Sequence, residues 1–207
     1  ILEELEEAEA AISHMQSAPR GVLRLSAPMS FGVDFVAPAV SDFMASYPEL
    51  RVNMQLSDRK VDLIEEGYDL AIRIGELTDS SLIARKLAPT SMYVLASPEY
   101  LERRGRPEHP DDLADHECLL YTLTAHTYTW RFSNGGGDVV HVQVEGNLEA
   151  NNGEALLKAA VAGRGVARLP DFIAAAAIRN GELVPILAGW SEWSAAVWVL
   201  YPHKRHL

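Results

Sequence analysis

The chain has 207 residues, of which 48% are hydrophobic and 23% charged, and its formal net charge is −11. This length allows one large domain or two small ones, with enough apolar residues for a core. The negative charge argues against nucleic-acid binding by this chain, because Lys and Arg contacts to phosphate supply most of that affinity. Its apolar runs are far shorter than the roughly 18 residues of a membrane-spanning helix, so no membrane span is expected.

The first 18 residues have the pattern of a helix that pairs along one narrow stripe. Ile1, Leu5, Ala8, Ile12 and Met15 recur at alternating spacings of four and three, with glutamates between them. This is the a/d pattern of a short coiled coil, and a surface helix packed on its own domain is the alternative. The segment lacks the basic and apolar regions of a signal peptide, so we expect it to be the interior of a helix, and a processed secreted chain is the alternative.

From residue 19 onward, strand and helix patterns alternate. Apolar–polar alternation predicts strands, apolar residues at helical spacing predict helices, and Gly or Pro marks the breaks. The expected elements are strand 22–26, helix 31–48 with Pro38 in its first turns, strand 51–57, a short helix 58–67 capped by Asp58 and ended by Gly67, strand 69–75, strand and helix within 91–105, a β-hairpin within 129–146, helix 151–162, strand 166–170, helix 171–181 and strand 194–202. Strand–helix–strand order with short connections predicts an α/β fold with parallel pairing.

The stretch "AGRGVARLP" at residues 162–170 has a spacing of glycines that is typical of phosphate loops. Gly163 and Gly165, however, follow a predicted helix and precede a predicted strand. A phosphate loop needs the opposite order, with the glycines between a strand and the start of a helix. The sequence therefore predicts only a tight turn here.

No pattern for catalysis or metal binding is found in the sequence. It contains no G-x-S-x-G, no H-E-x-x-H and no P-loop, and the pair His203 and His206 at the chain end is a weak metal motif. The single cysteine, Cys118, lies in the apolar run "ECLLY" and is expected to be a core residue. We therefore expect no enzymatic activity, no metal and no cofactor.

Polar residues follow several of the predicted strands. Ligands of open α/β sheets bind beyond the carboxyl ends of parallel strands. Those ends and the helix start that faces them carry Met29, Ser30, Ser57, Arg73, Thr122, Asn151 and Asn152. The guanidinium of Arg73, close to free helix N–H groups, favours a ligand with a carboxylate. A solvated or salt-bridged arginine at the sheet edge is the alternative.

Several blocks resemble the effector-binding domain of LysR-type transcriptional regulators. They are "GVLRLSAPMSFG", "YPELRVNMQLSD" with "DLIEEGYDLAIRIG", and "NNGEALLKAAVAGRGVARLPDFIAAAAIRNGELVPIL", and the similarity covers about residues 19–207. The resemblance implies two Rossmann-like lobes as in type 2 periplasmic solute-binding proteins. It places residues 1–18 at the end of the linker helix, 19–90 and 197–207 in lobe I, and 91–196 in lobe II.

The resemblance also implies a function and a set of partners. A small-molecule effector binds between the lobes, at the seven positions above, and alters how a homodimer or homotetramer presents its winged helix-turn-helix to DNA. That DNA-binding segment is expected upstream of residue 1, and the protein is expected in the cytoplasm without a membrane partner. A secreted solute receptor of a transporter is the alternative, against which the coiled-coil pattern argues. An enzyme on the same scaffold is a further alternative, which no motif supports.

Overall fold

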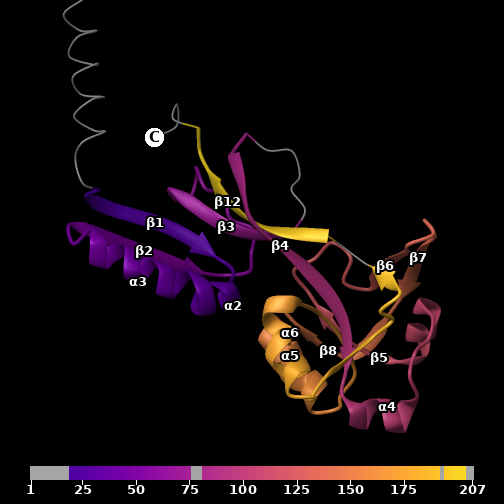
Figure 1. Ribbon diagram of the computed structural model, residues 1–207. Coiled ribbons are helices and arrows are strands. Elements are labelled where there is room, and N and C mark those ends of the chain that lie inside the picture. Colours follow the sequence, from indigo (N-terminus) through magenta and orange to yellow (C-terminus); the bar gives the residue numbers. More distant parts are fainter. Residues whose placement is uncertain (1–18, 76–80, 192–193, 204–207) are drawn as a thin grey trace, which may run out of the picture.

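Figure 1 shows the computed structural model, which describes residues 19–75, 81–191 and 194–203. The pairing helix expected over residues 1–18 lies outside these residues. The helices are α2 (Met29–Phe31), the π-helical turn η1 (Gly32–Val36), α3 (Ala37–Ser46), α4 (Pro98–Arg104), the three-ten helix η2 (Pro110–Asp115), α5 (Gly153–Val161) and α6 (Asp171–Arg179). The strands are β1 (Gly21–Ala27), β2 (Leu50–Leu56), β3 (Leu70–Gly75), β4 (Ile83–Ala96), β5 (Glu117–Tyr121), β6 (Thr129–Asn134), β7 (Val139–Gln143), β8 (Glu145–Ala150), β9 (Val166–Pro170), β10 (Val184–Ile186), β11 (Trp190–Ser191) and β12 (Ser194–Tyr201).

The elements form two groups that share one long strand (Figure 1). The main sheet follows the order β2-β1-β3-β12-β4-β9-β5-β8, and β10 also pairs with β4. The first group holds β1, β2, β3 and β12 with α2, η1 and α3. The second group holds β5 to β11 with α4, η2, α5 and α6. Strand β4 belongs to both, because it pairs with β12 in the first group and with β9 and β10 in the second.

The first group is a parallel sheet extended by an antiparallel strand. Strand β1 pairs in parallel with β2 and β3, and β12 joins β3 antiparallel. In β2 every second residue is partly or fully buried, which confirms the alternation that predicted this strand. Leu25, Ala27, Ile72 and Val197 form the core, against which residues of the α2–η1–α3 segment pack.

The second group covers its sheet on both faces. Strand β5 pairs in parallel with β8 and β9. Leu119 faces α5 and α6 and packs with Leu156. Its neighbour Cys118 faces the β6–β7 hairpin and packs with Trp130 and Phe132, which confirms it as a core residue. The predicted hairpin is therefore confirmed and forms the second cover of a two-sided sheet.

The helix predicted over residues 31–48 is present, but it begins earlier than predicted and contains a π-helical turn between two α-helical parts. α2, η1 and α3 follow one another without a break, so the helical segment begins at Met29. Pro38 occupies the first turn of α3 but lies well inside the whole segment. A proline inside a helix removes an N–H donor and crowds the preceding turn, and the wider π-helical turn before it relieves this conflict. The segment ends at Ser46 because Tyr47 precedes Pro48, and a residue before proline avoids the helical conformation.

The short helix predicted over residues 58–67 is wrong, because this segment consists of turns. Asp58 does not cap it; its Oδ1 instead accepts a hydrogen bond from the backbone N–H of Met29 at 2.8 Å. Asp62 supplies the local cap, with Oδ1 accepting from two N–H groups at 3.0 Å each. Gly67 ends the turn at φ +70°, as its position in the sequence indicated.

The tight turn predicted within residues 162–170 is confirmed. Helix α5 ends at Val161 and strand β9 begins at Val166. Gly163 has φ +69°, a left-handed conformation that favours glycine. A Cβ on Gly165 would lie 2.5 Å from the carbonyl oxygen of Glu117, so only glycine lets the two backbones approach this closely.

Candidate functional site

The carboxyl ends of β1 and β2 lie side by side at one edge of the first group. The backbone N–H of Ser57 donates to the carbonyl oxygen of Ala27 at 2.9 Å, so the two strands end at the same level. Asp58 follows, and its side chain accepts the hydrogen bond from Met29 described above. Ser30, the next residue in α2, is only 9% exposed. This edge therefore brings a carboxylate and two hydroxyl side chains close to one another.

Arg73 extends from β3 near this edge, with its guanidinium partly buried. Nη1 donates to the carbonyl oxygen of Ile72 at 2.8 Å, and Nη2 donates to Oγ of the fully buried Ser26 at 3.1 Å. Both of these acceptors are neutral. The pKa of Arg73 lies below its ordinary value, chiefly because burial disfavours the charge and secondly because Arg59 repels it; attraction by groups including Asp58 offsets this only in part. A ligand anion would add to the attraction that Asp58 and Glu66 already exert on this guanidinium.

The strand ends of the second group also gather at one edge. The backbone N–H of Thr122, directly after β5, donates to the carbonyl oxygen of Ala150 at the end of β8, at 3.0 Å. Asn151 is exposed there, and the side chain of Asn152 caps α5 by accepting from the N–H of Ala155 at 3.2 Å. Helix α6 begins directly after β9, which runs parallel to β5. The beginnings of α5 and α6 therefore lie at the same edge as these strand ends.

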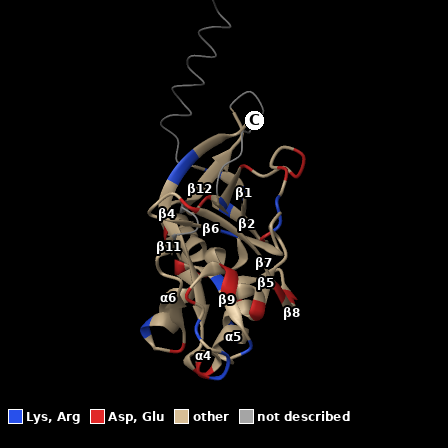
Figure 2. Ribbon diagram, turned by 90° about the vertical axis from the view of Figure 1, so that its right-hand side faces the viewer, with Lys and Arg blue, Asp and Glu red and all other residues tan. Residues whose placement is uncertain are grey.

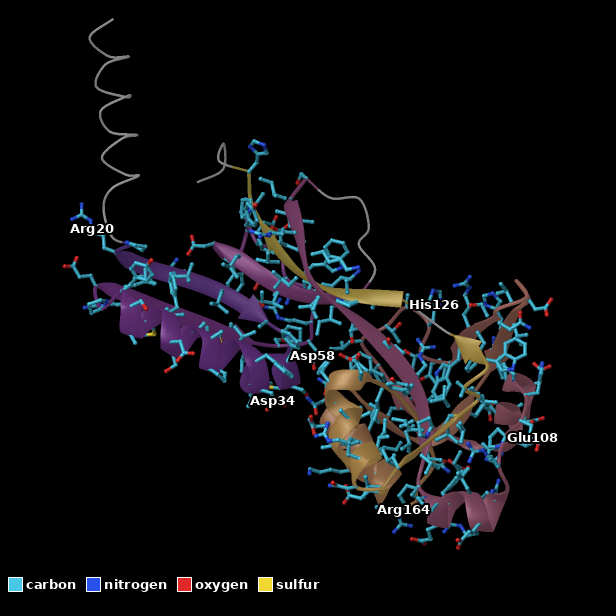
Figure 3. The ribbon with its side chains drawn as sticks, in the orientation of Figure 1. Arg20, Asp34, Asp58, Glu108, His126 and Arg164 are labelled. Atoms are coloured by element: carbon cyan, nitrogen blue, oxygen red, sulfur yellow. The ribbon has the colours of Figure 1, made fainter. Side chains whose placement is uncertain are left out.

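These two edges face each other. Phe172 of α6 packs edge-on against Phe31 of α2, with ring centroids 5.3 Å apart. Tyr121, the last residue of β5, lies near Asp58: burial first and this carboxylate second raise the pKa of its phenol above the usual range. Figure 3 shows Asp58 on the side of the first group nearest to α5 and α6. The facing edges, with Arg73 on one of them, form the candidate ligand-binding site.

Comparison with known proteins identifies the family of this chain. Residues 16–207 match the model of the LysR substrate binding domain. The chain belongs to this family. It is 41% identical over 207 residues to an uncharacterized HTH-type transcriptional regulator of Haemophilus influenzae, which covers the whole chain and 72% of that protein. It is 36% identical over 188 residues to the HTH-type transcriptional regulator CrgA of Neisseria meningitidis, which covers 91% of the chain and 62% of CrgA.

Solved structures agree with the family. The full-length virulence activator AphB of Vibrio cholerae has a TM-score of 0.80 at 28% identity, covering 99% of this chain and 71% of AphB. The regulatory domain of CrgA has a TM-score of 0.76 at 33% identity, covering 91% of this chain and 92% of that domain. The two-lobed, periplasmic-binding-like α/β fold expected from the sequence is thus confirmed.

The residues predicted to bind the effector of this LysR domain lie on the two facing edges. The first group contributes Met29, Ser30, Ser57 and Arg73, and the second contributes Thr122, Asn151 and Asn152. Two of these side chains already serve local structure. The Oγ of Ser57 accepts from the backbone N–H of Arg59 at 3.3 Å, and Asn152 caps α5. Contact of the seven residues with an effector remains a prediction.

Sequence reasoning left other residues of these edges out of the candidate site. Tyr121 directly precedes the predicted Thr122 and is a polar residue at the end of an apolar run, a signal that could have been used. Asp58 was assigned to a helix cap, although it directly follows a strand as Ser57 does. Phe172 gave no signal, because its contact with Phe31 joins residues that are far apart in the sequence.

Other kinds of site receive no support from the part of the chain that the structure describes. Among these residues no group of three or more His, Cys, Asp or Glu could hold a metal ion. No described helix is long and apolar enough to cross a membrane. A surface cavity of about 480 Å³ lies where Glu117 opens β5 and Glu145 opens β8. It therefore lies at the amino ends of these parallel strands, opposite to the edge at which ligands bind.

Proposed function

We propose that this chain senses a small molecule for a LysR-type regulator of transcription, and that the ligand carries a carboxylate. Arg73 is the observation that supports the ligand class. Its guanidinium is partly buried, and its hydrogen bonds to Ile72 and Ser26 use neutral oxygens. The carboxylates of Asp58 and Glu66 offset the cost of burying this charge only in part, so an anion gains more at this arginine than at an exposed one. Ser30 and Thr122 add hydroxyl groups from the two facing edges.

We also propose that ligand binding acts through the arrangement of two lobes, with the limits 19–90 and 197–207 for lobe I and 91–196 for lobe II. A ligand that touches both edges binds most tightly when they face each other, and so increases the population of that arrangement. The subunits of the oligomer then respond, and with them the winged helix-turn-helix outside this chain. Such a regulator acts on DNA in the cytoplasm.

A second copy of this chain is the partner that we propose for the outer face of the first group. Val33, Phe43 and Met44 of η1 and α3 are between 39% and 54% exposed, and α3 has no buried residue. Exposed apolar patches of this kind mark protein interfaces. Strand β2, which lies beside α3, is at one end of the described sheet. Sedimentation of the chain, with and without Phe43→Asp, tests whether a homodimer or homotetramer uses this face.

DNA contact is assigned to the region outside this chain. The net charge of −11 would repel phosphate. In Figure 2 the Lys and Arg positions are scattered among Asp and Glu over the ribbon. The curated relatives are named HTH-type transcriptional regulators, which favours this function over a transporter's solute receptor or an enzyme.

Ligand-induced thermal stabilisation tests the proposed ligand class. We would screen small monocarboxylates and dicarboxylates, each beside its neutral amide. At least one carboxylate should raise the melting temperature, its amide should not, and Arg73→Gln should weaken binding about 10- to 150-fold, the range for a lost hydrogen bond to a charged group. Arg131→Gln, at an exposed position of β6, is the matched control and should bind as the wild type does. Equal binding by the two variants would refute the role of Arg73.

A further inference from the structure

Three phenylalanine rings join the two groups beside the candidate site. Phe31 and Phe35 of the first group stack on each other, with centroids 4.8 Å apart and planes 23° apart. Phe172 of the second group meets both edge-on, at 5.3 Å and 81° from Phe31 and at 6.4 Å and 90° from Phe35. These are favourable geometries for aromatic pairs, whose attraction adds to the burial of apolar area. The rings therefore attract one another across the boundary between the groups.

Phe172 is held firmly on its own side of this boundary. Asp171, the first residue of α6, accepts hydrogen bonds from Thr90 Oγ1 at 2.6 Å, from the backbone N–H of Ser91 at 3.1 Å and from that of Phe172 at 2.8 Å. Thr90 is 5% exposed and lies in β4, where this strand passes from one group to the other. Phe172 thus keeps its position relative to β4 when the first group moves.

The partner rings are fixed to the first group. Phe31 packs against the core that contains Leu25 and Ile72. Phe35 lies one helical turn further along and is 47% exposed. If the two groups separate, Phe31 and Phe35 cannot follow Phe172, so the edge-on contacts break. Because none of the three rings is among the buried residues of the described cores, the contact can open without loss of either core.

We propose that Phe31, Phe35 and Phe172 form a latch that holds the two groups together when no ligand is bound. The latch lies at the start of α2 and of α6, at the edges that carry Arg73 and Thr122. Its strength sets how often the candidate site is open to solvent. This inference concerns the ligand-free protein and does not depend on which ligand binds or on its charge.

The distance between the groups in solution tests the latch. Nitroxide labels on Asp42→Cys in α3 and Arg179→Cys in α6, both at exposed positions, report this distance by pulsed electron paramagnetic resonance. Labelled protein is diluted with unlabelled protein, so that distances between copies do not contribute. The native Cys118 is buried, and burial raises the pKa of its thiol to about 12, so it stays protonated and unlabelled.

We expect one main distance for the parent protein. Phe172→Ala and Phe35→Ala should raise the ratio of separated to closed molecules about 2- to 13-fold, the range for loss of an aromatic pair. Phe172→Tyr, which keeps the ring, should restore the parent ratio. Tyr128→Ala is the matched control, because it removes a half-exposed ring whose hydroxyl bonds Glu149 within the second group, and it should leave the distance unchanged.

Two results would overturn the latch. The first is a Phe172→Ala distance distribution equal to that of Tyr128→Ala. The second is a parent protein that is already mainly separated without ligand. Phe35→Ala guards against misfolding as an explanation, because this ring is half exposed and its removal leaves both cores intact. A far-UV circular dichroism spectrum of each variant checks that the fold is retained.

Discussion

Replacing Asp171 by alanine should lower the stability of this protein by a large share, because its carboxylate is lost. Its three hydrogen bonds join the start of α6 to β4, through Thr90, Ser91 and its own neighbour Phe172. The hydroxyl of Thr90 is buried and would lose its charged partner. The backbone N–H groups of Ser91 and Phe172 lie nearer to solvent and can donate hydrogen bonds to water instead. Asp171 therefore ties the shared strand to a helix of the second group.

The expected cost follows from these contacts. A hydrogen bond to a charged group contributes about 1.5–3 kcal/mol, and a buried hydroxyl without a partner costs about 1–3 kcal/mol. Allowing for partial recovery by water, Asp171→Ala should lower the free energy of unfolding by about 3 kcal/mol. At about 2–4 °C per kcal/mol for a chain of this length, the melting temperature should fall by about 6–12 °C.

Urea unfolding, followed by tryptophan fluorescence and circular dichroism, measures this free energy. Coincident transitions by both probes are required before one value is assigned to a two-lobed protein. Thr90→Val should cost about 1 kcal/mol, and the double variant should cost less than the sum of the two, because both residues share one bond. Asp34→Ala, at an exposed position of η1, is the control and should change stability by less than about 0.5 kcal/mol. A loss of under about 1 kcal/mol for Asp171→Ala would refute this reasoning.

Three further predictions concern the second group. Leu156→Ala empties a fully buried site and should cost about 2–5 kcal/mol in urea unfolding, whereas Leu148→Ala, which is 37% exposed, should cost clearly less; equal losses would contradict the assigned core. Gly165→Ala forces the backbone away from Glu117 and should lower the melting temperature, whereas Gly135→Ala, which meets open space, should not. Burial raises the pKa of the Cys118 thiol from 9.0 to about 12, so the folded state holds a proton that the unfolded state releases above pH 9. Stability should therefore decline between about pH 9 and pH 12, less steeply in Cys118→Ala, and a parallel decline in both proteins would show that another group causes it.

Features that depend on neighbouring residues could be predicted from the sequence. The turn at Gly163 and Gly165 and the strand β2 each have a local cause, the left-handed glycine and the alternating pattern. The conformation of segment 58–67 could not be predicted in this way. The side chain of Asp58 accepts a hydrogen bond from Met29, which belongs to a different crossover connection. Strand β8 was missed because "EGNLEA" shows little alternation and owes its strand conformation to pairing with β5.

The candidate site was predictable to the extent that strand order determines it. Arg73 and Thr122 follow from the rule that ligands of α/β sheets bind at the carboxyl ends of strands. The partners of Arg73, and the approach of Tyr121 to Asp58, depend on how the two groups meet. Phe172 and Phe31 come together only through that meeting, so no local pattern could indicate the latch.

The pairing of β4 with β12 contains one irregularity that allows a single strand to serve two cores. Val197 pairs with Ala88 and Trp198 with Lys86, so Leu87 is an extra residue opposite this step, and it is 52% exposed. An extra residue reverses the side-chain alternation on either side of it. Deletion of Leu87 would restore a regular ladder. The side chains that β4 contributes to the second core would then point to the opposite face of the sheet. We therefore expect relatives to have no insertion or deletion at this position, even though the side chain of Leu87 is half exposed.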